Sequence, residues 1–261
     1  MEARRPILDL SSDVGELPGS DGAAVDAAIL GCVTSANVAC GGHVGDPNSM
    51  ARVCQVAVAR GVAIGAQVSF ADREGFGRRR LTVAFDTLVS QLAEQLGQLH
   101  VAAVAAGGGV TYMRPHGALY NTALVDDETA EAVVAATPQQ MPVLCLPGTA
   151  LAAAADRAGH PVVPEIFADR AIDDRGLLVA RGTSGAVITD PDHVTTRLTD
   201  WVRTGELIST SGRPVPLQAR SICTHSDTVG AVTMLKSLRK VLIEAGAVLE
   251  PFTTPGSGSD R

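Results

Sequence analysis

Residues 34–46 read Thr34-Ser35-Ala36-Asn37-Val38-Ala39-Cys40-Gly41-Gly42-His43-Val44-Gly45-Asp46, a run of small and apolar residues followed by a glycine-rich loop. The first half has the pattern of a buried β-strand, and a helical pattern begins at Pro47. The loop glycines let the backbone approach a ligand closely or take positive φ. His43 and Asp46 are residue types that bind metals and transfer protons near neutral pH. The stretch therefore predicts a strand whose carboxyl end carries a functional loop.

The same arrangement recurs along the chain, because predicted strands alternate with predicted helices. We predict strands at residues 7–10, 33–39, 62–66, 110–113, 141–146, 162–170 and 217–223, with a last edge strand at 248–251. Helices are predicted at 21–31, 47–60, 84–106, 126–136, 149–158, 192–204 and 229–245. This alternation implies a parallel sheet, and several strands that end in one polar site favour a closed α/β barrel over an open sheet.

The length of 261 residues is large for one ordinary domain but normal for one α/β barrel. No linker divides the chain, so we predict a single domain over residues 1–252. Residues 253–261 are rich in Gly and Ser and are predicted to form a disordered tail. Residues 173–184 carry turn signals without periodicity, and we expect a surface excursion there.

The composition argues against several functional classes. The net charge is −7 and no basic cluster occurs, which disfavours nucleic-acid binding. No apolar run is long enough to cross a bilayer, and the N-terminus lacks the apolar core of a signal peptide. We therefore expect a cytoplasmic protein that does not bind membranes. The five cysteines are widely spaced without a CxxC pair, which disfavours both a disulfide scaffold and a zinc–thiolate site.

Three of the six histidines share one topological position. His43, His116 and His225 each follow a predicted strand and have Gly, Ser or Asp beside them, whereas the other three lie in a helix or in turns. With nearby carboxylates they could bind a divalent metal or divide acid and base roles. Segment 11–16 taken alone also fits a solvated turn with a helix cap. The HExxH, P-loop and GxSxG patterns are absent. The carboxylates concerned are Asp13, Glu16, Asp46, Asp72 and Asp227.

Charge and glycine are dense in residues 67–80. Asp72, Arg73 and Arg78 alternate there with Gly and Phe, which favours a loop shaped for an anionic ligand, because arginine forks match carboxylate and phosphate geometry. A solvated charged surface is the alternative interpretation. The residues by themselves leave both open.

Six blocks of the sequence resemble the LamB/YcsF family. They are DLSSDVGE (9–16), SANVACGGHVGD (35–46), SFADREGFGRR (69–79), RPHGALYN (114–121), EIFADR (165–170) and CTHSD (223–227). The blocks follow the family's order from about residue 7 to about residue 250, so the resemblance covers nearly the whole chain.

The resemblance implies a distorted seven-stranded β/α barrel of the glycoside hydrolase/deacetylase type. It also implies an enzyme, a hydrolase that acts on a cyclic amide. The implied enzyme is the A subunit of an ATP-dependent 5-oxoprolinase, which opens the lactam of 5-oxo-L-proline to L-glutamate while ATP is cleaved to ADP and phosphate. The 5-oxoprolinase subunits B and C are the expected partners. ATP is the expected cosubstrate, and a divalent metal such as Mg²⁺ is a further candidate cofactor.

The implied chemistry assigns roles to residues. Such a site needs cations for phosphate, a base for water, and metal or His groups for developing negative charge. We expect the catalytic centre to consist of Asp13, His43, Asp46 and His116, with Asp13, His43 and His116 as candidate metal ligands. The expected substrate- or phosphate-binding residues are Glu16, Asn37, Asp72, Arg73, Arg78, Arg114, Asp169, Arg170, His225 and Asp227.

The chain departs from the family pattern at several positions. Ser11, Gly42, Gln67-Val68, Arg114 and Ser226 stand where Asn, Phe, His-Pro, Lys and Gly are usual. Gln67 matters most, because glutamine cannot act as an acid or base and is a poor metal ligand. Two alternatives therefore stay open. One is a metal-dependent amide hydrolase or deacetylase that works without ATP, and the other is a non-catalytic subunit that binds ligand for its partners.

Overall fold

A computed structural model describes residues 5–228 and 230–254. Within these residues, seven parallel strands form a closed barrel in the order β1-β2-β3-β4-β5-β6-β9, and β9 pairs back with β1. The predicted α/β barrel is confirmed. Its strands are β1 (Ile7–Val14), β2 (Ser35–Ala39), β3 (Ala63–Val68), β4 (Val110–Pro115), β5 (Val143–Cys145), β6 (Val162–Phe167) and β9 (Ser221–Thr224).

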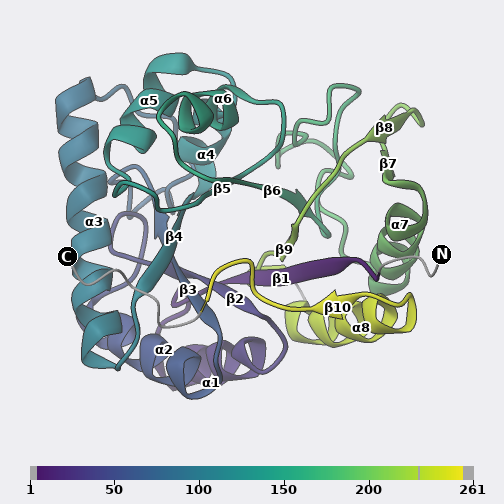
Figure 1. Cartoon of the computed structure of the whole chain (residues 1–261), viewed down its shortest axis with the longest axis horizontal. Coiled ribbons are helices and arrows are strands. Elements are labelled where there is room, and N and C mark those ends of the chain that lie inside the picture. The colour runs from purple at the N-terminus through teal and green to yellow at the C-terminus, as the bar shows by residue number, and fades with distance from the viewer. Residues whose placement is uncertain (1–4, 229, 255–261) are drawn as a thin grey trace.

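Helices surround the barrel, and each of its parallel strands is followed in sequence by at least one helix (Figure 1). The short β10 (Val248–Leu249) extends the sheet beside the beginning of β1, as predicted for the last edge strand. The helices are α1 (Gly19–Leu30), α2 (Pro47–Ala59), α3 (Phe85–Ala105), α4 (Gly117–Ala123), α5 (Asp127–Ala135), α6 (Ala150–Arg157), α7 (Pro191–Thr204) and α8 (Ala231–Glu244).

Three short elements were not predicted. Helix α4 begins directly after His116 and has no side-chain cap, so neither a capping residue nor a long apolar period marks it. Strands β7 (Glu206–Ile208) and β8 (Pro214–Pro216) form a separate antiparallel hairpin. β8 begins and ends with proline, which disguises it as a loop. Residues 173–184 contain neither helix nor strand, as expected for the excursion.

The barrel encloses many buried polar side chains, and a small apolar cluster of Ala63, Tyr112, Leu144 and Val163 is separate from the main hydrophobic core. Along β1, Leu8 and Leu10 join the hydrophobic core, whereas Asp9 and Asp13, on the other face, are also buried. Arg114 of β4 reaches Asp13 of β1 at 2.8 Å, although these strands are not neighbours in the sheet. Their ion pair therefore crosses the inside of the barrel. The apolar faces of the strands point outward and pack against the helices.

Gly65 of β3 leaves room for an aromatic side chain inside the barrel. The Tyr112 hydroxyl of β4 donates to Asn37 Oδ1 of β2 at 2.8 Å, so its ring must pass over β3. A Cβ atom added at Gly65 of β3 would lie 2.0 Å from the Tyr112 ring. Only glycine leaves room for this contact.

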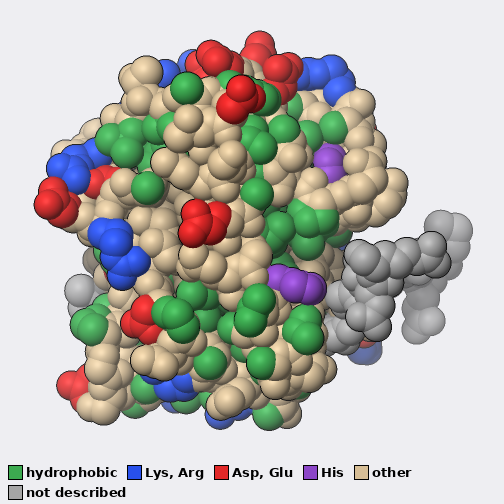
Figure 2. Space-filling model, turned by 90° about the vertical axis from the view of Figure 1, so that its left-hand side faces the viewer, with side chains coloured by type: hydrophobic (Ala, Val, Ile, Leu, Met, Phe, Trp, Pro, Cys, Tyr) green, Lys and Arg blue, Asp and Glu red, His purple; other side chains and the backbone are tan. Residues whose placement is uncertain are grey.

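The helix-covered side of the barrel that includes α3 carries acidic and basic side chains with hydrophobic side chains between them (Figure 2). Among the described residues, no helix is both long enough and apolar enough to span a membrane. Thr253, the first residue of the predicted tail, contacts the Thr111 hydroxyl at 2.8 Å. Residues 255–261 of that tail lie outside the described part of the chain.

Candidate active site at the carboxyl ends of the barrel strands

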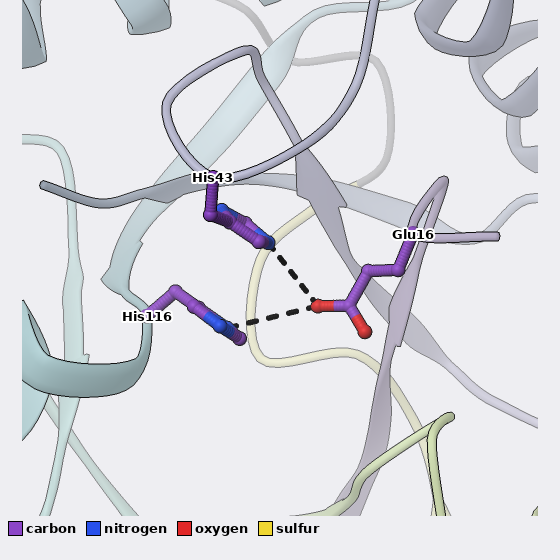
Figure 3. Close-up of side chains that lie close together, drawn as sticks. All are labelled: Glu16, His43 and His116. Carbon is purple, nitrogen blue, oxygen red and sulfur yellow. Dashed lines mark hydrogen bonds and ion pairs between the residues drawn. The ribbon is translucent and has the colours of Figure 1, made fainter. Parts of the chain in front are cut away.

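Three buried side chains meet where the barrel strands end. Glu16 follows β1, His43 lies in the loop after β2, and His116 follows β4 (Figure 3). Glu16 Oε1 lies 3.3 Å from His43 Nε2 and 3.6 Å from His116 Nδ1. The two imidazole rings stack with their centroids 3.8 Å apart. The structure thus brings together two of the four expected catalytic residues, with Glu16 beside the stacked rings and facing one nitrogen of each (Figure 3).

In each histidine, one ring nitrogen faces away from Glu16, and the hydrogen bond made by that nitrogen shows which of the two nitrogens carries the hydrogen. His116 Nε2 lies 3.2 Å from the carbonyl oxygen of Phe76, which can only accept, so Nε2 carries the hydrogen. The Ser69 hydroxyl donates to the Phe70 carbonyl and therefore accepts from His43 Nδ1 at 3.1 Å. When both rings are neutral, the nitrogens that face Glu16, His116 Nδ1 and His43 Nε2, therefore carry the lone pairs, and the lone pair of His116 Nδ1 accepts from Gln67 Nε2 at 3.0 Å.

Burial and neighbouring charges determine the ionisation states of the side chains in this cluster. Burial, reinforced by the charges of His43 and Arg114, holds the pKa of His116 well below its usual value, so this ring is neutral at neutral pH. Burial acts to raise the pKa of Glu16, but the hydrogen bond and charge of His43 outweigh it, and the net shift is downward. Glu16 is therefore a carboxylate that faces a neutral imidazole.

These three residues fit a divalent metal. Their ligand atoms all lie within 4.8 Å of one another. Nitrogen and carboxylate ligands bind Zn²⁺-like ions at about 2.0–2.2 Å, and tetrahedral geometry then separates ligands by about 3.4 Å. The observed separations of 3.3 and 3.6 Å match that spacing. Each His also donates its other ring N–H to a protein oxygen, as metal-bound histidines almost always do.

Asp13 is not part of this set, contrary to the expected ligand triad. Its Oδ1 accepts from Asn37 Nδ2 at 3.0 Å and from Arg114 Nη1 at 2.8 Å. Glu165 lies on the other side of the same guanidinium at 3.5 Å. Burial raises the pKa of Asp13, and Arg114 opposes that rise. Asp13 therefore belongs to an ion-pair network inside the barrel, and Glu16 takes the place predicted for it.

A second histidine–carboxylate pair lies across the site. Asp169 accepts from His225 Nδ1 at 3.0 Å and from the Thr228 hydroxyl at 2.6 Å. Burial acts to raise the pKa of Asp169, but the charge and hydrogen bond of His225 outweigh it and lower the value to about 2. The His225 ring also stacks on Phe167 at 5.2 Å. This pair brings together two expected binding residues.

A cavity of about 510 Å³ opens beside both histidine pairs. His116 and His225 line it, together with the expected binding residues Arg78, Arg114 and Arg170. The excursion of residues 173–184 contributes further lining residues, including Arg175 and Arg181. The cavity is thus rich in guanidinium groups, which suits an anionic ligand.

Comparison with known proteins identifies the family. The model of the LamB/YcsF family matches residues 8–256. The chain belongs to the LamB/YcsF family. The 5-oxoprolinase A subunit of Streptomyces avermitilis is 47% identical over 249 residues, which cover 94% of this chain and 100% of that protein. The 5-oxoprolinase A subunit of Kocuria rhizophila is 45% identical over 249 residues, covering 94% and 99%.

Solved structures agree with this assignment. The lactam utilization protein of Thermus thermophilus has a TM-score of 0.86 and 34% identity, with 94% of this chain and 100% of that chain covered. A peptidoglycan N-acetylglucosamine deacetylase domain of Eubacterium rectale has a TM-score of 0.51 and 13% identity, covering 99% and 94%. The second likeness extends to the fold alone, and it confirms the deacetylase type of barrel.

Three expected site residues of this LamB/YcsF chain instead stabilise loops. Asp46 is exposed and caps α2, accepting from the backbone N–H groups of Asn48 and Ser49. Asp72 accepts from Gly75 N and pairs with Arg79 within its own loop. Arg73 donates to two backbone carbonyls of the loop that carries His43. None of the three joins the buried cluster or lines the cavity.

Other residues of the LamB/YcsF site were not expected from the sequence. Ser69 and the Phe76 carbonyl orient the two histidines, and Gln95 fixes Ser69 through both backbone groups of that residue. Phe76 adopts a φ of 55°, which turns its carbonyl toward His116. A Cβ at Gly42 would lie 2.4 Å from Ser69 Oγ, so this departure from the family pattern suits the Ser69 position. The high density of glycine and charged residues in residues 67–80 was the sequence signal that could have pointed to these residues.

Gln67 lies inside the cluster. Its Nε2 is 3.1 Å from Glu16 Oε1 and 3.0 Å from His116 Nδ1, and its Oε1 has no hydrogen-bond partner within the described residues. An amide N–H donates to both neighbours and so supports a carboxylate and a neutral imidazole. Gln67, which departs from the expected family pattern, is therefore in direct contact with Glu16 and His116.

Proposed function

We propose that this LamB/YcsF protein is the A subunit of a 5-oxoprolinase and hydrolyses the lactam of 5-oxo-L-proline to L-glutamate. The names of its relatives support this activity. The observation that carries it is the buried group of Glu16, His43 and His116 beside an arginine-rich cavity. A site of this kind joins a proton acceptor to cations that bind an anionic substrate.

The finer proposal is that ATP activates the lactam. An unactivated lactam is a poor electrophile, and transfer of the γ-phosphoryl group to its oxygen makes the ring carbon open to attack by water. Water then adds to this carbon, the C–N bond breaks, and the nitrogen takes up a proton. A second water releases phosphate and leaves the carboxylate of glutamate. The arginines of the cavity offset the negative charge that accumulates during these steps.

The residues of the cluster divide the proton transfers. Once the Gln67 amide turns away, the neutral His116 ring offers its Nδ1 lone pair and accepts a proton from the attacking water. The Glu16 carboxylate orients that water and stabilises the imidazolium that forms. If Glu16, His43 and His116 instead hold a divalent metal, the Nδ1 lone pair of His116 would be a ligand and not a base, and the metal would supply a Lewis acid that favours deprotonation of water. The proposed partners are subunits B and C, and the cytoplasm is the proposed location.

A second candidate is amide hydrolysis that depends on metal and not on ATP. The donor set of Glu16, His43 and His116 favours it, because two imidazoles and a carboxylate are a common ligand set of hydrolytic zinc sites. ATP dependence separates the two candidates. A binding role without catalysis is the remaining outcome.

The test is glutamate release from 5-oxo-L-proline by the full chain mixed with candidate subunits B and C, with and without ATP and Mg²⁺. Release that requires this chain and ATP supports the proposal. His43→Ala and His116→Ala should each lower the rate by at least about 100-fold, because each removes a group next to the reacting atoms. His100→Ala, on the exposed face of α3, is the matched control and should retain the rate. Full activity of either site variant contradicts the assignment.

A further inference from the structure

Positively charged side chains outnumber negatively charged ones along one edge of the cavity. Arg78, Arg170 and Arg181 line it and come from three separate segments of the chain. Arg78 forms an ion pair with Asp227, and Arg181 approaches the same carboxylate at 3.5 Å. Asp227 is thus shared by two guanidinium groups.

Arg170 has no carboxylate partner in the part of the chain that the structure describes. Its guanidinium donates to the carbonyls of Ala186 and Val179, yet the residue is only 3% exposed. Burial and the nearby charge of Arg181 lower the pKa of Arg170 to about 10, so the side chain is still charged at neutral pH. The carboxylates of Asp169 and Asp227 attract this cation without forming an ion pair with it, so its N–H groups can still pair with an anionic ligand.

We propose that these three arginines form a binding site for a phosphoryl dianion, and that Asp227 is the internal counterion which the phosphoryl group displaces. One carboxylate neutralises a single positive charge, whereas three guanidinium groups match the charge and the several acceptor oxygens of a phosphoryl group. Without ligand, Asp227 holds Arg78 and Arg181 at the cavity edge. With ligand, both arginines turn their N–H groups to the phosphoryl oxygens.

This inference rests on the proposed function, because that function brings a phosphorylated ligand into the cavity. It adds the place where the phosphoryl group binds. It assigns the phosphoryl group to the cavity edge formed by the excursion of residues 173–184 and not to Arg73, which is engaged with backbone carbonyls. Arg181 is then a specificity-determining residue that the family blocks did not contain.

The probe is inorganic phosphate, titrated calorimetrically into the full chain at constant ionic strength. Arg181→Gln should weaken phosphate binding by about tenfold or more, since it removes a charge-assisted fork. Asp227→Asn should tighten binding, because the internal competitor loses its charge. Arg181→Lys keeps the charge without the fork and should fall between wild type and Arg181→Gln. Arg203→Gln is the matched control: Arg203 pairs with Asp200 and does not line this cavity.

Two results overturn the inference. One is phosphate binding that Asp227→Asn weakens or leaves unchanged. The other is a loss in Arg181→Gln no larger than in Arg203→Gln. A parallel titration uses 5-oxo-L-proline. If its binding depends on Arg181 and Asp227 while that of phosphate does not, the site takes a carboxylate and the phosphoryl assignment is wrong. Because phosphate binding requires no turnover, this result is independent of whether the 5-oxoprolinase activity is found.

Discussion

The imidazole rings of His43 and His116 lie parallel, with their centroids 3.8 Å apart and an angle of 6° between their planes. Two imidazolium ions would repel each other strongly at this separation, so the pair accommodates one positive charge at most. A neutral His116 beside the Glu16 carboxylate satisfies this condition. The same stacking places one nitrogen of each ring next to Glu16, so the proposed acid–base chemistry and the proposed metal binding would use the same atoms.

Metal binding should require Glu16 and not Asp13. Glu16→Gln removes an anionic ligand and should lower affinity for Zn²⁺ or Co²⁺ by about 100-fold or more. Asp13→Asn leaves the three ligand atoms in place and should retain the metal. Metal content per chain after dialysis, measured by atomic emission, distinguishes the two variants. Loss of metal in Asp13→Asn with retention in Glu16→Gln would restore the triad expected from the sequence.

Replacing Gln67 by His should strengthen metal binding. The amide nitrogen lies 3.1 Å from Glu16 Oε1 and 3.0 Å from His116 Nδ1, so an imidazole in its place adds a fourth ligand. We expect a gain in Co²⁺ affinity of about tenfold or more. The visible spectrum of bound Co²⁺ should also show a change in coordination. Gln98→His, at an exposed position of α3, is the control. Equal Co²⁺ affinities in both variants would contradict the prediction.

Stability should fall with acid through the Asp169–His225 pair. The pKa of Asp169 is lowered from 3.8 to about 2, so its carboxylate stabilises the folded state above the unfolded pKa. This contribution is about 2 kcal/mol at neutral pH and is lost as pH falls from about 4 to about 2. Asp169→Asn should therefore flatten the decline of the unfolding free energy over that window, measured by urea denaturation. The exposed Asp156→Asn should keep the wild-type slope, and an equally steep slope in Asp169→Asn would refute the prediction.

Gly65→Ala should destabilise the barrel through Tyr112. The new Cβ would lie 2.0 Å from the Tyr112 ring, and overpacking of this kind costs about 1–3 kcal/mol. Gly97→Ala is the opposite case, because nothing lies within 4 Å of its added Cβ in the middle of α3. It should stabilise the protein by about 0.5–1 kcal/mol. Thermal unfolding measures both changes. A stabilising Gly65→Ala would show that the interior is less tightly packed than described.

Helices and strands were predicted correctly where the local sequence carried a strong signal, such as a cap or a proline in the first turn. Helix α2 has an N-cap at Asp46, proline in its first turn and Gly61 past its end, and its predicted and observed bounds agree within a residue. Helix α4 lacks such signals and was missed. The cap role of Asp46 was also missed, since aspartate before a helix and aspartate in a metal site look alike in sequence.

The alternation of strands and helices, the hydrophobic strand faces and the placement of polar residues after strands were all determined by the sequence itself. These features depend on neighbours along the chain, and they were enough to predict a barrel with His43 and His116 at one edge. Only the tertiary structure decided that Glu16 and not Asp13 lies beside His43 and His116. It also decided the hydrogen-bond partners of the two histidines and the placement of Arg181 at the cavity. Each depends on contacts between segments far apart in sequence, such as the 2.8 Å bond that ties Asp13 to Arg114 across the barrel. Closure of the barrel creates that contact, and with it the different surroundings of carboxylates that look equivalent in the sequence.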